Sequence, residues 1–291
     1  MSSWAALPTM ETRRSLAAGF TLVEVLVSTA VLMLLVVIMS QMTRSIASSW
    51  TAGSGNSERR QNVRALADFI GQELRSATIP VNASAAAPNL QFVLNPAAVT
   101  ARYPSALFWQ APVATDSSAG DLAEIGYFVR WVTSGSVPRA QLCRFFVNQG
   151  DPNYLIDTNA AWVTDALLQA VAPADSASGY VGLFADNVIG FWARCLQSDG
   201  TEIAAANALY DSRVTHTLPA SVEISLVLID GPSASRMTTA LQSQLVALSS
   251  GSSSAVNAAD FLKKIQADPG LKSISPGARA YTSRIFLENS R

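Results

Sequence analysis

The sequence is poor in charged residues, and it has few lysines, one histidine and two cysteines. Asp, Glu, Lys and Arg make up 14% of its 291 residues, against a typical value of about 25%. The net charge is −1, and lysine occurs only at Lys263, Lys264 and Lys272. Without a basic surface, the chain is not expected to bind nucleic acid.

The residues that most often carry catalysis are also scarce. A Ser-His-Asp triad would need His216 as its base, with Asp211 and Ser212 nearby, but their spacing defines no triad and no G-x-S-x-G elbow is present. No Cys/His cluster has zinc spacing, and no glycine-rich phosphate loop is found. We therefore predict a protein that is not an enzyme and that uses no cofactor.

The two cysteines and three of the acids leave alternatives open. One disulfide is geometrically possible if the strands predicted around Cys143 and Cys195 pair with each other, but two buried thiols are the preferred interpretation. Asp151, Asp157 and Asp165 are candidate calcium ligands. They do not match an EF-hand loop, so surface acids are the preferred interpretation and no metal site is predicted.

What the chain has instead is one long apolar run, residues 20–42, in which only Glu24 is charged. A bilayer core needs about 20 apolar residues in a helix, and a helix satisfies its own backbone groups there. The run therefore predicts a membrane-spanning helix. A buried core helix of a soluble domain is the alternative.

Glu24 is unusual within this run, because a carboxylate deep in a bilayer costs about 2.5–3.5 kcal/mol. It lies one helical turn after Phe20. If the chain were cut before Phe20, the new amino group would lie beside the carboxylate, and the two charges would neutralise each other within or between chains. Alternatively, Glu24 lies at headgroup depth, where a negative charge suits the start of a helix.

The stretch AAG-FTLVEVLVSTAVLM, preceded by Arg13 and Arg14, resembles the type IV prepilin motif. The resemblance implies that a membrane peptidase, prepilin peptidase/N-methyltransferase, removes the leader 1–19. It would cut after Gly19 and methylate Phe20. Glu24 then occupies the fifth position of the mature chain, with a role in assembly.

The resemblance also bears on the membrane orientation. The positive-inside rule is ambiguous, because arginines both precede the helix and follow it at Arg44, Arg59 and Arg60. The resemblance implies a leader in the cytoplasm, a single pass through the inner membrane, a mostly periplasmic chain and other pilin-like subunits as partners. A competing signal-peptidase site at residues 47–49 would remove the whole helix.

After the membrane helix, residues 43–80 are predicted to continue it in amphipathic form. Gly53 and Gly55 each weaken a helix by about 1 kcal/mol, so residues 43–57 are expected to bend or melt. Beyond them an apolar stripe recurs at helical spacing, with charged residues such as Glu73 on other faces. The stripe consists of Val63, Leu66, Ile70 and Leu74.

Residues 81–291 have the pattern of a β-rich domain, a meandering antiparallel sheet with hairpins. A short helix is predicted at 160–171, and a helical insertion, expected to be the most mobile segment, at about 232–277. The aromatic residues of the strands are predicted to form the sheet core. Strands are predicted at 90–94, 106–113, 124–132, 142–147, 188–196, 221–229 and 278–289.

One long N-terminal helix followed by an antiparallel sheet is an α+β, pilin-like fold. The runs LADFIGQELR, IGYFVRW and DNVIGFWARCLQSDG resemble the J-type minor pseudopilin of type II secretion. More distantly, the chain resembles pilin-like proteins of Verrucomicrobia-type cassettes. The predicted function is a minor pilin-like subunit of an envelope filament. The alternative is a membrane-anchored binding module or adhesin that does not polymerise.

Overall fold

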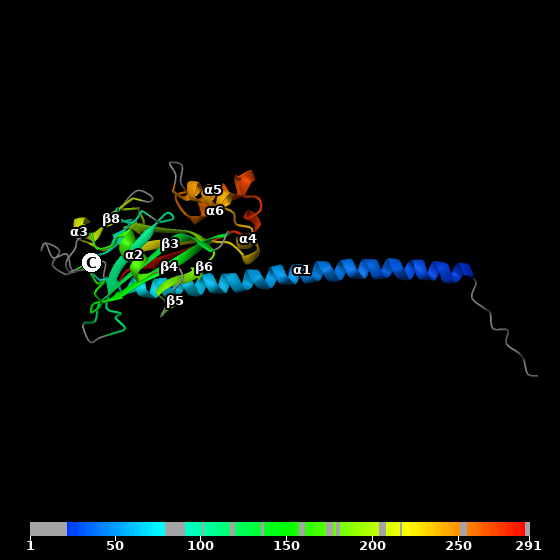
Figure 1. Ribbon diagram of the computed structural model, residues 1–291, viewed down its shortest axis with the longest axis horizontal. Helices are drawn as coiled ribbons and strands as arrows, with labels where there is room; N and C mark the ends of the chain where they lie inside the picture. Colours follow the sequence, from blue (N-terminus) through cyan, green and yellow to red (C-terminus); the bar gives the residue numbers. More distant parts are fainter. Residues whose placement is uncertain are drawn as a thin grey trace, which may run out of the picture. The chain divides into compact units, whose positions relative to one another are not determined.

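The computed structural model describes residues 22–78, 91–100, 102–116, 120–134, 137–156, 161–172, 177–178, 181–203, 208–215, 217–250 and 255–288. The chain divides into two compact units, Met1–Ser57 and Glu58–Arg291. The first contains the N-terminal part of helix α1. The second contains the rest of α1 and all of the strands (Figure 1).

Helix α1 comprises Leu22–Arg75. The backbone is helical through residues 43–57, so the predicted melted segment is not found there. Gly53 and Gly55 lie inside a helix of 54 residues, where two interior glycines lower helix stability without removing hydrogen bonds. Glycine retains its backbone N–H, and only proline would have taken a donor away.

Seven strands form the larger sheet, in the order β5-β6-β4-β3-β2-β1-β8, and all of their pairs are antiparallel. Its centre is the hairpin of β3 and β4, paired from Ala123↔Asn148 to Ser134↔Val137. Strands β5, β6 and β8 were not predicted. The strands are β1 (Val93–Leu94), β2 (Ala106–Ala111), β3 (Ala123–Ser134), β4 (Val137–Asn148), β5 (Ala177–Ser178), β6 (Val181–Asp186) and β8 (Tyr210–Asp211).

A second, three-stranded sheet has the order β10-β9-β7 and is also antiparallel. Its strands are β7 (Val188–Leu196), β9 (Ser221–Leu228) and β10 (Arg279–Phe286). The prediction of one meandering sheet was therefore wrong, because β7 leaves the larger sheet and pairs with β9 instead. The alternation of β9 explains why: Ile224 and Leu226 on one side and Val227 on the other are all buried, which suits a sheet covered on both faces.

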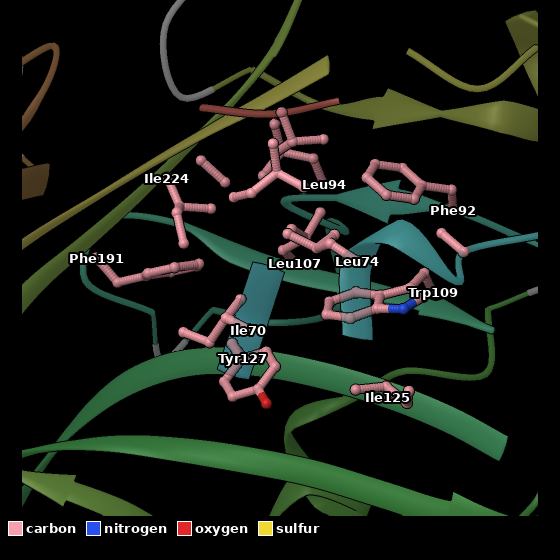
Figure 2. Close-up of a cluster of buried hydrophobic side chains, with 14 of the residues drawn as sticks. Ile70, Leu74, Phe92, Leu94, Leu107, Trp109, Ile125, Tyr127, Phe191 and Ile224 are labelled. Carbon is pink, nitrogen blue, oxygen red and sulfur yellow. The ribbon is translucent and has the colours of Figure 1, made fainter. Parts of the chain in front are cut away.

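The central core lies between the two sheets and includes the second half of α1. Ala67, Ile70 and Leu74 of α1 pack there with Trp109 and Tyr127 of the larger sheet, and Ile224 and Phe191 come from the smaller one (Figure 2). Ile70 and Leu74 have no exposed surface (0%), and Val63 is also buried. The predicted stripe of α1 is thus confirmed, except that Leu66 is only partly buried.

The other face of the larger sheet is covered by residues 154–156 and 161–172, the second of which contains helix α2 (Asp165–Val171). Thr164 caps this helix by accepting a hydrogen bond from Leu167 N (3.2 Å), so the helix begins later than the predicted residue 160. Gly126 has a clear steric role on this face. A Cβ there would lie 2.1 Å from the ring of its cross-strand partner Phe108.

The outer face of the smaller sheet is covered by the segment between β9 and β10. This segment contains α4 (Gly231–Ser235), α5 (Thr239–Ser250), α6 (Ala258–Ala267) and the short helices η1 (Pro269–Leu271) and η2 (Ser275–Gly277). Trp192 of β7 packs against this segment. Its ring centroid lies 5.0 Å from that of Phe261, and its Nε1 donates to Ala255 O at 3.0 Å. The expectation of a mobile insertion does not fit this packing. Helix α6 buries Phe261 and Ile265 completely.

The burial of the α1 stripe predicts unequal costs for the same substitution at two positions. Leu74→Ala should destabilise the globular unit by about 2–5 kcal/mol, because it leaves a cavity between the sheets. Leu66→Ala, the matched control on the same helix, should cost less because Leu66 is partly exposed. Thermal or chemical unfolding followed by tryptophan fluorescence measures both. Equal losses would contradict the assigned packing of the helix.

Candidate functional site

The first half of α1 presents a predominantly apolar surface. Residues Val25–Met42 form a segment of 18 residues that is long and apolar enough to cross a membrane, and none of it is buried within the structure. Most of the exposed side chains are leucine, valine, isoleucine or methionine, for example Leu26 (62% exposed) and Met39 (68%). An apolar helical surface of this length fits a single-pass membrane anchor.

The polar side chains early in this segment bond to their own helix. Ser28 Oγ donates to Val25 O at 3.0 Å, and Thr29 Oγ1 donates to Leu26 O at 2.9 Å. Each hydroxyl therefore has an acceptor that does not depend on water. A bilayer core supplies no hydrogen-bonding partners, so this internal bonding makes both residues compatible with lipid.

The processing residues predicted from the sequence lie outside this description. Gly19 and Phe20 precede Leu22, the first described residue. The backbone of Glu24 belongs to the first turn of α1, but its side chain is outside the described part. The proximity of Glu24 to the amino group of Phe20 therefore stays a prediction.

A buried ion pair joins α1 to the larger sheet. Arg144 on β4 donates from Nε to Glu73 Oε2 at 3.2 Å and from Nη2 to Glu73 Oε1. The hydroxyl of Tyr127 on β3 donates to Glu73 Oε2 at 2.5 Å. The side chains of Arg144 and Glu73 are only 7% and 11% exposed. Three elements therefore converge on one carboxylate.

The surroundings of this ion pair are mainly aromatic. The Arg144 guanidinium lies 4.4 Å from the ring centroid of Phe146 and 5.6 Å from that of Phe69, both within cation–π range. Burial raises the pKa of Tyr127 well above its usual range, and the neighbouring Glu73 carboxylate raises it further. Tyr127 is therefore a hydrogen-bond donor at neutral pH, and the cluster holds α1 against the larger sheet.

Sequence reasoning placed Glu73 on a face of α1 away from the apolar stripe, and this was wrong. Glu73 directly precedes Leu74 and is itself buried. Its partner is 71 residues away in sequence. The available signal was Arg144 itself, a charged residue inside the strongly apolar run LCRFFV, which calls for a buried counter-charge.

The candidate catalytic residues are engaged in structural contacts. Asp211 forms an ion pair with Arg213 (2.6 Å between Oδ2 and Nη2), and Ser212 Oγ accepts a hydrogen bond from Phe92 N at 2.9 Å. His216 lies outside the described residues. The structure therefore brings together no triad among the residues that it describes.

The candidate calcium ligands are not brought together either. Asp151 accepts hydrogen bonds from the backbone and side chain of Asn153, and Asp165 accepts from Thr100. Asp157 lies outside the described ranges. Among the described residues, no group of three or more His, Cys, Asp or Glu side chains is arranged to hold a metal ion.

Cys143 and Cys195 are both buried and not bonded to each other. They lie on β4 and β7, which belong to different sheets, so the strand pairing that a bridge required does not occur. Burial raises the pKa of Cys143 to about 11, and burial also raises the pKa of Cys195. Both thiols are therefore protonated at neutral pH and act as small apolar side chains.

Comparison with known families gives one match, at the N-terminus. Residues 14–40 match the family described as the prokaryotic N-terminal methylation motif. The chain carries this motif. It indicates a type IV pilin-like protein, and it implies processing by prepilin peptidase and pilin-like assembly. No curated protein and no solved structure matches the chain.

The methylation motif gives the N-terminal residues their context. The matched segment covers Gly19, Phe20 and Glu24 and extends through most of the apolar segment Val25–Met42. The methylation motif and a segment apolar enough to cross a membrane therefore occupy the same stretch of the chain. The globular unit, which follows, has no counterpart in the match.

Proposed function

We propose that this protein is a minor pilin-like subunit of an envelope filament, of the type II secretion or type IV pilus kind. The observation that carries the proposal is the methylation motif on a helix that is apolar and exposed over Val25–Met42. A chain with one such helix and one compact globular unit suits a subunit that is stored in a membrane and then assembled through its helix.

The proposal specifies where each part of the chain acts. The leader 1–19 lies in the cytoplasm, the helix crosses the inner membrane, and the globular unit lies in the periplasm. The partners are prepilin peptidase/N-methyltransferase and other pilin-like subunits. The role is structural rather than enzymatic, and it needs no cofactor. The described part of the chain supports this view, because its candidate catalytic residues serve structural contacts.

A narrower assignment also belongs to this proposal. The runs that resemble the J-type minor pseudopilin supply central parts of the globular unit. They include the second half of α1, the hairpin strand β3 and strand β7. A minor pseudopilin of type II secretion is therefore the form that we favour, with a Verrucomicrobia-type pilin-like protein as the more distant form.

Processing provides the direct test. In cells that make a prepilin peptidase, the wild-type protein should start at Phe20 and carry one added methyl group on its amino nitrogen. Gly19→Leu should leave full-length precursor in the membrane, because a bulky side chain blocks the residue before the cut. Intact-mass analysis of the membrane-extracted protein measures both.

Ala5→Leu is the matched control, since it places the same leucine side chain within the leader but far from the junction. It should be processed like the wild type. A mature protein that starts at Trp50 would instead identify the site at residues 47–49 as the true cleavage site. That result, or an uncleaved wild type, would contradict the proposal.

A further inference from the structure

The two sheets have four outer edges, and three of them are short or covered. The larger sheet ends in β5 and β8, which have two residues each. The outer edge of β7 is hydrogen-bonded to other segments, since Ser105 N donates to Phe191 O (3.1 Å) and Ile203 N donates to Cys195 O (2.9 Å). The fourth edge is β10, which has eight residues and, within the described part of the chain, pairs with β9 alone.

The register shows which backbone groups of β10 face outward. Leu287 N donates to Ala220 O at 3.1 Å, so the odd-numbered residues of β10 direct their N–H and C=O groups toward β9. In an antiparallel pair the intervening residues direct theirs to the opposite side. The backbone groups of Ala280, Thr282, Arg284 and Phe286 therefore form an open edge. They have no hydrogen bond to any residue that the structure describes.

This edge lacks most of the devices that prevent strand addition. Natural edge strands are shortened, bulged, interrupted by proline or covered by charged side chains. Strand β10 contains no proline, and its pairing with β9 is regular over all eight residues. The side chain of Arg284 does not block the edge, and among the described residues its two Nη groups have no hydrogen-bond partner, so they can still meet a carboxylate. The side chain bends back to Ser221 Oγ (2.8 Å) and lies 5.2 Å from the ring centroid of Phe286.

The charge of the edge indicates what would fit there. Strand β10 carries Arg279 and Arg284 and no acid. Glu223 faces Arg284 across the strand pair but is bound to Arg194. Among the described residues, no carboxylate forms an ion pair with Arg284. Next to it, Phe286 is 64% exposed and presents an apolar surface beside the edge.

We propose that the β10 edge is a docking site for an extended, acidic segment of another protein, which adds to the smaller sheet as a fourth strand. Backbone hydrogen bonds to the four outward-facing residues supply the attachment. A carboxylate against Arg284 and an apolar side chain against Phe286 supply the selectivity. This surface belongs to the globular unit and goes beyond the proposed function, which concerns the N-terminal helix.

Charge disfavours a second copy of the same strand as the occupant. Pairing of two β10 strands would bring four arginine side chains onto two neighbouring strands, with no acid from either strand to offset them. Like charges on adjacent strands destabilise a sheet. An acidic segment has the opposite effect and satisfies the same backbone groups.

The test uses the full chain in detergent and a labelled peptide as long as β10, made of alternating valine and glutamate. Fluorescence anisotropy should show saturable binding. A peptide of alternating valine and lysine should bind about tenfold more weakly, and so should the valine–glutamate peptide with alternate amides methylated, because the latter cannot complete the hydrogen bonds.

Two variants locate the binding on the protein. Thr282→Pro removes an outward-facing N–H but leaves the hydrogen bonds to β9 in place, and it should weaken binding about tenfold or more. Thr282→Val, its matched control, keeps the amide and should bind normally. Arg284→Glu should reverse the preference, so that the lysine peptide binds better than the glutamate peptide. Unchanged thermal melting confirms that each variant is folded.

Each other result would overturn the proposal. Failure of the valine–glutamate peptide to bind would exclude an acidic segment as the occupant. If Thr282→Pro bound this peptide as tightly as the wild type does, the β10 edge would be excluded as the binding site. Self-association of the wild type that Thr282→Pro abolishes, seen by analytical ultracentrifugation, would make a second copy the occupant instead. All of these measurements are independent of processing at Gly19, so the failure of one proposal is distinguishable from the failure of the other.

Discussion

Replacing Glu24 by Gln should leave the protein inserted and processed but should abolish its cross-linking to other pilin-like subunits. The reason lies in the cost of a carboxylate in lipid, about 2.5–3.5 kcal/mol. If processing creates an amino group at Phe20 of a neighbouring subunit, pairing of that group with Glu24 would relieve this cost. The pairing would also align the incoming helix along the axis of those already assembled. Removal of the charge therefore removes the free-energy gain that would favour assembly in register.

The measurement is in-cell cross-linking to partner subunits, with cleavage followed on the same samples. Ser28→Ala is the matched control in the same apolar segment, because the Ser28 hydroxyl bonds only to its own helix. It should assemble like the wild type. If Glu24→Gln cross-links as well as the wild type does, the filament proposal loses its main support. A membrane-anchored receptor or adhesin that does not polymerise then becomes the better explanation.

The second large effect is expected at the ion pair between Glu73 and Arg144. Arg144→Met should destabilise the globular unit by about 3–5 kcal/mol, because it leaves the Glu73 carboxylate buried without its counter-charge. Tyr127 would still donate one hydrogen bond to that carboxylate, but one neutral donor does not replace a guanidinium. Chemical denaturation followed by tryptophan fluorescence measures the loss.

A double replacement separates two quantities: the destabilisation caused by an unpaired buried charge, and the net contribution of the ion pair to the free energy of unfolding. Glu73→Leu combined with Arg144→Met should recover most of the stability that Arg144→Met loses, since apolar residues of similar size often replace a buried ion pair at little cost. Arg64→Met, at an exposed position of α1, is the surface control and should have little effect. If Arg144→Met were as mild as Arg64→Met, the ion pair would not be what holds α1 to β3 and β4.

The parts of the fold that local patterns encode were predictable. The methylation motif is a short contiguous signal, and the stripe at Ile70 and Leu74 follows the helical repeat. The aromatic residues of the strands were predicted to form the sheet core. This is confirmed for Trp109, Tyr127 and Trp192, whose exposed fractions are at most 1%. In each case neighbouring residues in the sequence contain the necessary information.

What could not be predicted depends on contacts between distant residues. The division into two sheets arises because β7 pairs with β9, and no local pattern specifies which strand a partner will be. Glu73 was assigned to the wrong face of α1 because its partner, Arg144, lies far away in the sequence, in strand β4. The two-residue strand β8 is defined by its pairing with β1 rather than by its composition. The burial of α6 depends on Trp192, which belongs to β7 and not to the helical segment.

The segment between β9 and β10 has both of its ends at the same place. Leu228 and Arg279 are direct partners in the strand pair, so residues 229–278 form a loop that leaves and re-enters the sheet at adjacent positions. Lengthening such a loop is cheap, about 0.6 kcal/mol for each doubling of its length. Removing it is costly, because Trp192 and Val227 are covered by its helices. The arrangement therefore permits growth at this position more readily than shortening, and related chains that lack these helices are expected to carry polar residues in place of Trp192 and Val227.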